Sequence, residues 1–256
     1  MHHYFVENEN IEELTNLEFL VVFSEDDKKH IKAQRLRIGE HVTVVDKSGN
    51  YFELEITDIR DSDVFAKISK RVSHKEKSWS LTLFQGISKN TKLDEVLRAT
   101  TEIGIDRFYA VNMARSVAKV KESSLVNKLD RYKNIAKSAS MQSGRGTIPH
   151  VDILNNEHDF LHKLKDFDLV IVFWEKAEEN SFVDSAIKQK MGNCKSLVKQ
   201  IAVVIGPEGG ITEEEIAAIS KESTCSVCTL GDTILRTETA GVVSCALVSF
   251  VLGRLL

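Results

Sequence analysis

Residues 203–215 read VVIGPEGGITEEE, in which an apolar stretch runs into three glycines and a proline and then into an acidic segment. A strand followed by a glycine turn and a helix start aims free backbone N–H groups at one point, so the stretch suggests a ligand-binding loop. Phosphate loops require Gly-x-x-x-x-Gly-Lys-Ser/Thr or Gly-x-Gly-x-x-Gly, and Gly206, Gly209 and Gly210 fit neither pattern. Glu208 stands where a phosphate would need a cation. The alternative is an ordinary strand-to-helix turn.

The helix after this loop carries its own start signal. Thr212 and Glu215 form Thr-x-x-Glu, the spacing of a capping box, in which each residue satisfies a backbone N–H group of the first turn. The helix therefore does not depend on a bound anion.

The surrounding chain alternates between apolar runs and helical stretches. The runs SLTLFQGI, RFYAVNM, DLVIVFW and QIAVVIG predict strands, and helices are expected around residues 91–103, 124–142 and 181–190. Strands separated by helices indicate a parallel sheet covered on both faces. Ligands of such sheets collect at the carboxyl ends of the strands, which is where GPEGG lies.

The first 73 residues follow a different pattern. The alternating segments HVTVVD, YFELEITDI and VFAKIS, separated by KSGN and RDSD turns, predict a small antiparallel sheet or barrel. A helix starting at Ser24, with Asp27 three residues later, is expected to interrupt it. The charged stretch at residues 69–78 is interpreted as a linker.

The 256 residues are long enough for two domains, and their formal charge is −4, which is not the composition of a general nucleic-acid binder. The charge is uneven: residues 115–149 hold eight Lys/Arg against two Asp/Glu, a local excess of +6. Such a patch can bind an anion, or it is a solvated helix face.

Four cysteines and the lack of a signal peptide are typical of a cytosolic, cytoplasmic protein with reduced thiols. Cys225-x-x-Cys228 lacks the second ligand pair of a zinc site, so packing is favoured and no metal is expected. No apolar run reaches the length of a membrane span, so no membrane partner is expected. The apolar C-terminal stretch is interpreted as a core or interface helix.

A second glycine turn follows at residues 225–243, CSVCTLGDTILRTETAGVV, where Thr237 is placed to cap the last helix. Two glycine loops at neighbouring strand ends can enclose a mostly apolar ligand with a few polar groups.

At this point the chain resembles a known family. IGPEGGITEEE together with LGDTILRTETA resembles the two signature loops of the bacterial small-subunit rRNA uridine N(3)-methyltransferases, which belong to the SPOUT class and use S-adenosyl-L-methionine. The resemblance extends through TEIGIDRFYAVNMARSVAK, SASMQSGRGTIPHV, MHHYFV and HIKAQRLRIGEHVTVVDKSG, in the right order over nearly the whole chain.

The resemblance implies an α/β SPOUT fold with a C-terminal trefoil knot at residues 74–256, which would hold the cofactor site and the dimer interface. It implies an RNA-binding PUA-like β-barrel domain at residues 1–73. The expected protein is a homodimeric S-adenosylmethionine-dependent methyltransferase that modifies N(3) of one specific uridine of 16S rRNA, within the small ribosomal subunit. A non-catalytic RNA-binding ribosome assembly factor is the alternative, and the intact LRTETA argues against it. A nucleotide-hydrolysing enzyme is disfavoured by the missing phosphate lysine.

Several positions depart from the family's usual pattern. They are His3 for an arginine, Ala99 for a lysine, Ala114 for a glutamate, and Ala139-Ser140-Met141 for Ala-Ala-Glu. They fall on expected RNA contacts and local packing and leave both loops intact.

The cofactor is expected to bind the backbone of the two glycine loops, which can approach it closely. Glu175, which follows the strand LVIVFW, is a further candidate. The cofactor-binding residues are Glu175, Ile205, Gly206, Pro207, Glu208, Gly209, Gly210, Leu230, Gly231, Ile234, Leu235 and Arg236.

Uracil N(3) becomes nucleophilic when its proton leaves and negative charge spreads to the flanking oxygens. Arg236 is the predicted catalytic cation, since its guanidinium stays charged. Glu238 is the second predicted catalytic residue, and either Glu208 or Glu238 would orient the arginine or accept the proton. A salt bridge between Arg236 and Glu238 that only pins the loop is the structural alternative. The predicted RNA-binding residues lie on the matched segments: His30, Arg35, Arg37, Lys89, Lys92, Arg115, Gln142 and Arg145.

Overall fold

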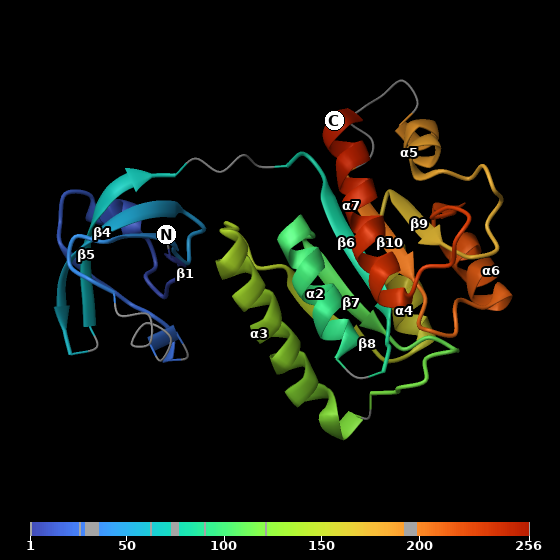
Figure 1. Cartoon of the computed structure of the whole chain (residues 1–256), viewed down its shortest axis with the longest axis horizontal. Coiled ribbons are helices and arrows are strands. Elements are labelled where there is room, and N and C mark those ends of the chain that lie inside the picture. Colours follow the sequence, from blue (N-terminus) through green and yellow to red (C-terminus); the bar gives the residue numbers. More distant parts are fainter. Residues whose placement is uncertain are drawn as a thin grey trace. The chain divides into compact units, whose positions relative to one another are not determined.

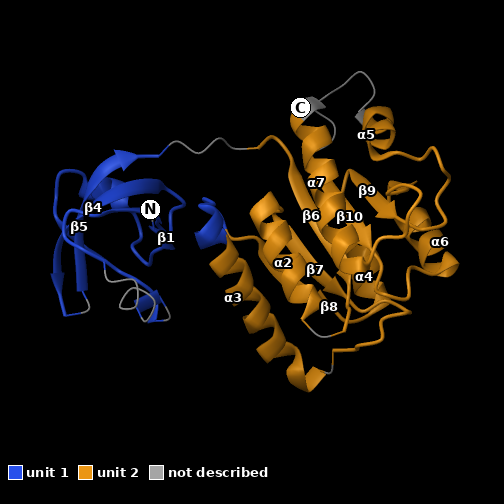
Figure 2. Ribbon diagram, viewed as in Figure 1, with its two compact units in different colours: residues 1–76, 140–147 blue, residues 77–139, 148–256 orange. Residues whose placement is uncertain are grey.

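The chain divides into two compact units, one of residues 1–76 and 140–147 and the other of residues 77–139 and 148–256 (Figure 2). The computed structural model describes residues 2–25, 27–28, 36–61, 63–72, 77–89, 91–120, 122–191 and 199–255. Residues 140–147, which the sequence analysis grouped with the second domain, are part of the first compact unit.

The first unit contains one five-stranded sheet in the order β1-β3-β4-β5-β2. Its elements are β1 (His2–Phe5), the short 3-10 helix η1 (Ile11–Leu14), β2 (Phe19–Val21), β3 (His41–Val45), β4 (Tyr51–Arg60) and β5 (Asp63–Arg71). Strand β4 shows why the sheet forms: Phe52, Leu54 and Ile56 are buried, while the residues between them are only half-buried. The core of this unit lies on that inner row.

The prediction of an antiparallel sheet is confirmed for three of the four strand pairs. Strands β3, β4, β5 and β2 pair antiparallel, whereas β1 pairs parallel with β3. Because β1 and β3 are far apart in the chain, no tight hairpin fixes their relative direction. The helix expected from Ser24 begins with a hydrogen bond from the Asp27 N–H to the Ser24 Oγ (3.3 Å), and its continuation lies outside the described residues.

The second unit is an α/β domain built on a six-stranded parallel sheet in the order β11-β9-β10-β6-β7-β8 (Figure 1). Its strands are β6 (Ser80–Gly86), β7 (Arg107–Val111), β8 (His150–Leu154), β9 (Leu169–Phe173), β10 (Gln200–Ile205) and β11 (Cys225–Cys228). Its helices are α2 (Lys92–Ile103), η2 (Glu122–Ser124), α3 (Leu125–Ser143), α4 (Glu157–Leu164), α5 (Val183–Met191), α6 (Glu213–Glu222) and α7 (Thr237–Leu255).

Helices cover both faces of this sheet, as the apolar strands predict. Side chains of α2, α3, α5 and α7 share one buried cluster with the strands, and those of α4 and α6 share the other. The predicted α/β class and parallel sheet are confirmed. Strand β8 and helix α4 were not predicted, because HVDIL is short and mixes polar with apolar residues.

The strand order reverses its direction at one point of the sheet. From β6 the chain moves outward through β7 to β8, and from β10 it moves over β9 to β11, so the order reverses between β6 and β10. In open parallel sheets a ligand site lies outside the carboxyl ends of the strands at such a reversal. Among the described helices, none is long and apolar enough to cross a membrane.

Candidate active site

A cavity of about 500 Å³ opens at the carboxyl ends of β9, β10 and β11, a size typical of small-molecule sites. Its lining includes every residue predicted to bind the cofactor: Glu175, Ile205, Gly206, Pro207, Glu208, Gly209, Gly210, Leu230, Gly231, Ile234, Leu235 and Arg236. It also includes Lys92, Asp232, Thr237 and Glu238. Two loops that are distant in the sequence therefore enclose one space.

The first loop, residues 206–210, is packed so closely that glycine is required. A Cβ at Gly206 would lie 2.8 Å from Ile211 Cγ1, and Gly210 has a positive φ of 74° with Glu175 Oε1 2.7 Å from its hypothetical Cβ. The carboxylate of Glu175 therefore closes over the loop. The predicted capping box at Thr212 and Glu215 is confirmed, since both of its hydrogen bonds are present.

Glu208 ties the first loop to the segment after β6. Its Oε1 accepts a hydrogen bond from the Lys89 backbone N–H at 3.0 Å and lies 4.0 Å from Lys92 Nζ. Glu208 stands where a phosphate loop would have a lysine, and its carboxylate holds the segment after β6 through the Lys89 N–H.

The second loop, residues 230–235, has fewer side-chain contacts. Gly231 has φ 109°, a conformation that strongly favours glycine, and its N–H donates to Thr229 Oγ1 at 3.1 Å. The side chain of Ile234 is 85 % exposed although it lines the cavity. An apolar group at the mouth of the cavity can contact a bound ligand.

Arg236 is exposed at the end of this loop and also lines the cavity. Within the described parts of the chain, the Arg236 guanidinium has no hydrogen bond or ion pair. The alternative, a salt bridge to Glu238 that only holds the loop, is therefore not present. Its five N–H donors are available to a ligand.

Glu238 instead pairs with Lys92, with 3.2 Å between Oε2 and Nζ. Burial alone would raise the pKa of Glu238, but the Glu238 backbone N–H, the Lys92 hydrogen bond and the charges of Lys92 and Arg236 outweigh it and lower the pKa. The carboxylate therefore stays ionised at neutral pH.

Thr237 is buried and does not cap α7 as predicted. It is the first residue of the helix, and its Oγ1 donates to the Gly206 carbonyl (2.6 Å) and accepts from Gln85 Nε2 (2.8 Å). The capping prediction was wrong because these two partners, distant in the sequence, compete for the hydroxyl.

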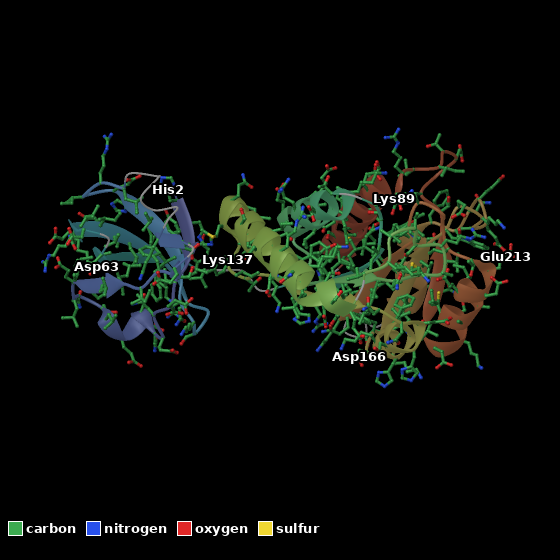
Figure 3. The ribbon with its side chains drawn as sticks, turned by 90° about the horizontal axis from the view of Figure 1, so that it is seen from below. His2, Asp63, Lys89, Lys137, Asp166 and Glu213 are labelled. Carbon is green, nitrogen blue, oxygen red and sulfur yellow. The ribbon has the colours of Figure 1, made fainter. Side chains whose placement is uncertain are left out.

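The predicted RNA-binding residues lie in different parts of the chain. Lys92 lines the cavity, Lys89 is exposed in the loop after β6 (Figure 3), and the Arg115 guanidinium donates to the Gly209 carbonyl at 3.0 Å. Arg37, Gln142 and Arg145 belong to the first compact unit, and the Arg145 carbonyl is hydrogen-bonded to His3 Nε2 at 2.8 Å. His30 and Arg35 lie outside the described residues. The structure therefore brings Lys89, Lys92 and Arg115 together around the first loop.

Sequence reasoning missed two parts of this site. Gln85 was read only as part of an apolar strand, and Lys92 was assigned to RNA alone. The signal for Gln85 was a lone amide in the run SLTLFQGI, since a buried amide needs a hydrogen-bond partner.

None of the three described cysteines, Cys225, Cys228 and Cys245, lines the cavity. Burial raises the pKa of Cys228 to about 11 and that of Cys245 to about 12, so both remain thiols at neutral pH. Across the described part of the chain, no three His, Cys, Asp or Glu side chains are grouped to hold a metal ion.

The charge of the cavity decides which ligands it suits. Among its lining residues, Glu175, Glu208, Asp232 and Glu238 are acidic and Lys92 and Arg236 are basic, which gives four negative charges against two positive ones, or −2. Such a lining repels a polyphosphate and attracts a cation. Close backbone from two glycine loops can bind the polar edges of a small ligand without side-chain bulk.

Fold and cavity together define a parallel α/β domain with a two-loop site for a small cationic ligand. The family model described as RNA methyltransferase domain matches residues 75–249, so this chain belongs to the RNA methyltransferase domain family, as the resemblance predicted.

Individual relatives agree over almost the full length. The chain is 27 % identical to Ribosomal RNA small subunit methyltransferase E of Bacillus subtilis (strain 168), covering 98 % of this chain and 96 % of the relative. It is 28 % identical to the protein of the same name from Mycobacterium bovis, over 86 % of this chain and 82 % of that one. Among solved structures, Ribosomal RNA small subunit methyltransferase E from Neisseria gonorrhoeae bound to S-adenosyl methionine is similar, with 25 % identity, a TM-score of 0.78, and 98 % and 97 % of the two chains covered.

Proposed function

We propose that this protein is an S-adenosylmethionine-dependent rRNA methyltransferase that methylates N(3) of one specific uridine of 16S rRNA. The observation that carries the proposal is the cavity between the two glycine loops, whose lining has a net charge of −2. S-adenosylmethionine carries a positive sulfonium and no phosphate, so its charge complements this lining, whereas ATP would be repelled. Membership in the RNA methyltransferase domain family supports the same reaction.

In the proposed reaction the uracil N(3) attacks the methyl group of the sulfonium, the methyl–sulfur bond breaks, and S-adenosylhomocysteine leaves as a neutral thioether. The N(3) proton must be lost, and the negative charge that develops lies on the flanking carbonyl oxygens. Arg236 would stabilise this charge, because its guanidinium lines the cavity and has no protein partner among the described residues.

Glu238 is the proposed acceptor of the N(3) proton. Glu238 lines the cavity, and its lowered pKa keeps the carboxylate ionised, which an acceptor of the proton must be.

The substrate-binding arrangement is also part of the proposal. The first compact unit, residues 1–76 and 140–147, would be a PUA-like RNA-binding barrel, with Arg37, Gln142 and Arg145 as its RNA contacts. The second unit, residues 77–139 and 148–256, would be a SPOUT domain with a trefoil knot, on which Lys89, Lys92 and Arg115 contact RNA around the first loop. The protein would act on the small ribosomal subunit in the cytoplasm.

A homodimer completes the proposed assembly. Helix α7 is strongly apolar, and its side chains Leu247 and Phe250 are 40 % and 61 % exposed. An exposed apolar helix face is typical of a protein interface, and the resemblance implies a dimer through this part of the chain.

Methylation of small subunits from a strain lacking this protein tests the function, with mapping of the modified base. The wild-type chain should produce N(3)-methyluridine at one position of 16S rRNA. S-adenosylhomocysteine should raise its melting temperature and ATP should not, since only a ligand of the native state stabilises it. Stabilisation by ATP alone, or a methyl group on another base, would refute the proposal.

The Arg236→Ala variant tests the catalytic assignment in the same assay. Its single-turnover rate should fall on the order of 100-fold, the effect of removing one preorganised donor to a developing oxyanion, while binding of S-adenosylhomocysteine stays near that of the wild type. Arg98→Ala, an exposed arginine on α2, is the matched control and should turn over normally. Normal turnover of Arg236→Ala would exclude the catalytic role, and loss of binding alone would make Arg236 a cofactor residue.

A further inference from the structure

A chain of two buried hydrogen bonds joins three segments of the second unit beneath the cavity. Gln85 on β6 is fully buried, and its Nε2 lies 2.8 Å from the Oγ1 of Thr237, 152 residues later. The same Oγ1 lies 2.6 Å from the Gly206 carbonyl oxygen. A carbonyl can only accept, so the single hydroxyl proton of Thr237 goes to Gly206 and the Gln85 amide must donate to Thr237.

The packing around this chain leaves no room for adjustment. A Cβ at Gly241, one turn after Thr237 on α7, would lie 2.4 Å from Gln85 Oε1. A Cβ at Gly86, directly after Gln85, would lie 2.4 Å from the Pro207 nitrogen. Glycine at both positions lets the end of β6, the first loop and the start of α7 approach closely enough for the two bonds to form.

The bonds join the two walls of the cavity. Gly206 is the first residue of the first loop. The second loop ends at Leu235, and Thr237 follows it after one residue, Arg236. The Thr237–Gly206 bond therefore fixes the distance between the loops, and Gln85 orients the hydroxyl that makes it.

We propose that Gln85, acting through Thr237, is a positioning residue that holds the two glycine loops at the separation required to bind S-adenosylmethionine. This inference rests on the proposed function. A ligand that contacts both loops binds more tightly when their relative position is fixed beforehand, because less conformational freedom is lost on binding. Gln85 itself has no contact with the ligand in this arrangement: it does not line the cavity.

The test measures S-adenosylhomocysteine binding by calorimetry on the full chain, with melting temperature recorded for each variant. Thr237→Val should weaken binding about tenfold, the effect of losing one net hydrogen bond, and Thr237→Ser should restore most of it. Gln85→Leu should weaken binding less, since the Thr237 hydroxyl can still reach Gly206. The double variant should bind no worse than Thr237→Val, because Gln85 acts only through that hydroxyl.

Thr82→Val is the matched control. Thr82 is a fully buried threonine on the same strand, and its hydroxyl has no hydrogen-bond partner among the described residues, so its loss should leave affinity unchanged. Gly241→Ala provides an independent route, since the added methyl would lie 2.4 Å from Gln85 Oε1 and 2.9 Å from Val96 Cγ1 and so displaces the Gln85 amide while Thr237 is kept. It should weaken binding at least as much as Gln85→Leu does.

The outcomes separate this inference from the function on which it rests. A wild-type chain that does not bind S-adenosylhomocysteine refutes the proposed function. If the wild type binds and Thr237→Val and Gln85→Leu lower only the melting temperature, with affinity unchanged, the hydrogen bonds are merely structural and the positioning role is wrong. Should Thr237→Val fail to fold, normal affinity of both Gln85→Leu and Gly241→Ala leads to the same conclusion.

Discussion

At the level of a single residue, Glu208 makes a glycine loop of the anion-binding type unsuitable for an anion. A glycine loop before a helix is a common anion site, yet here a carboxylate occupies the loop and accepts the backbone N–H of Lys89. Its charge is balanced in part by Lys92, 4.0 Å away. The loop is therefore held to the segment after β6 by its own side chain, without a bound anion.

Replacing Glu208 should separate its hydrogen bond from its charge. Glu208→Ala leaves the Lys89 N–H without its acceptor and should lower the free energy of unfolding by about 1 kcal/mol. Glu208→Gln keeps an acceptor oxygen and should lose less than half of that. Urea unfolding at neutral pH measures both, with the exposed Glu179→Ala as control. Equal losses for the Ala and Gln variants would show that the charge, and not the hydrogen bond, holds the loop.

Helix α6 is the element whose start the sequence defined most completely. Thr212 Oγ1 accepts the Glu215 N–H at 3.1 Å, and Glu215 Oε2 accepts the Thr212 N–H at 2.9 Å. The other oxygen, Oε1, accepts the Ala114 N–H at 2.8 Å, a contact that no local pattern predicts. One buried carboxylate thus caps α6 and holds the loop after β7.

The two capping residues should therefore differ in their contribution to stability. Thr212→Ala removes one capping bond and should lower the free energy of unfolding by about 1 kcal/mol, while Thr212→Ser should be close to the wild type. Glu215→Ala should cost more, because two N–H groups lose their acceptor at once. Denaturant unfolding provides the measurement, and the exposed Thr224→Ala after α6 is the control. A Glu215→Ala variant no less stable than Thr212→Ala would mean that the bond to Ala114 contributes nothing.

On the scale of the whole chain, a contact across 142 residues joins the two segments of the first compact unit. His3 Nε2 lies 2.8 Å from the Arg145 carbonyl oxygen, and His3 Nδ1 lies 2.9 Å from Thr43 Oγ1. A carbonyl accepts only, so Nε2 carries a proton. His3 thus joins β1 to the segment after α3.

The environment of His3 predicts a pH dependence of stability. Burial lowers the pKa of His3, against the smaller raising effect of the Arg145 hydrogen bond. As pH falls through the ordinary value near 6.5, the unfolded state takes up a proton that the folded state resists, so stability decreases. Melting temperatures between pH 7.5 and 5 should fall more steeply for the wild type than for His3→Gln. Equal slopes for His3→Gln and wild type would contradict the prediction.

The sequence by itself determined the features that depend on neighbours three or four residues apart. The alternation of β4, the buried strands of the parallel sheet and the capping box of α6 are local, and the structure confirms each of them. The glycine loops were located for the same reason: VVIGPEGGITEEE carries its strand end, its turn and its helix start within 13 residues.

Only the tertiary structure decided what the side chains of those loops contact. The bond from Thr237 to Gly206, the pairing of Lys92 with Glu238 and the closure of Glu175 over Gly210 join residues from separate strands and helices. Thr237 was misassigned as a cap because its choice between local and distant partners depends on the packing of α7 against β6. Hydrogen-bond partners of this kind are fixed by how the sheet is ordered, and strand order depends on long-range contacts that no local pattern encodes.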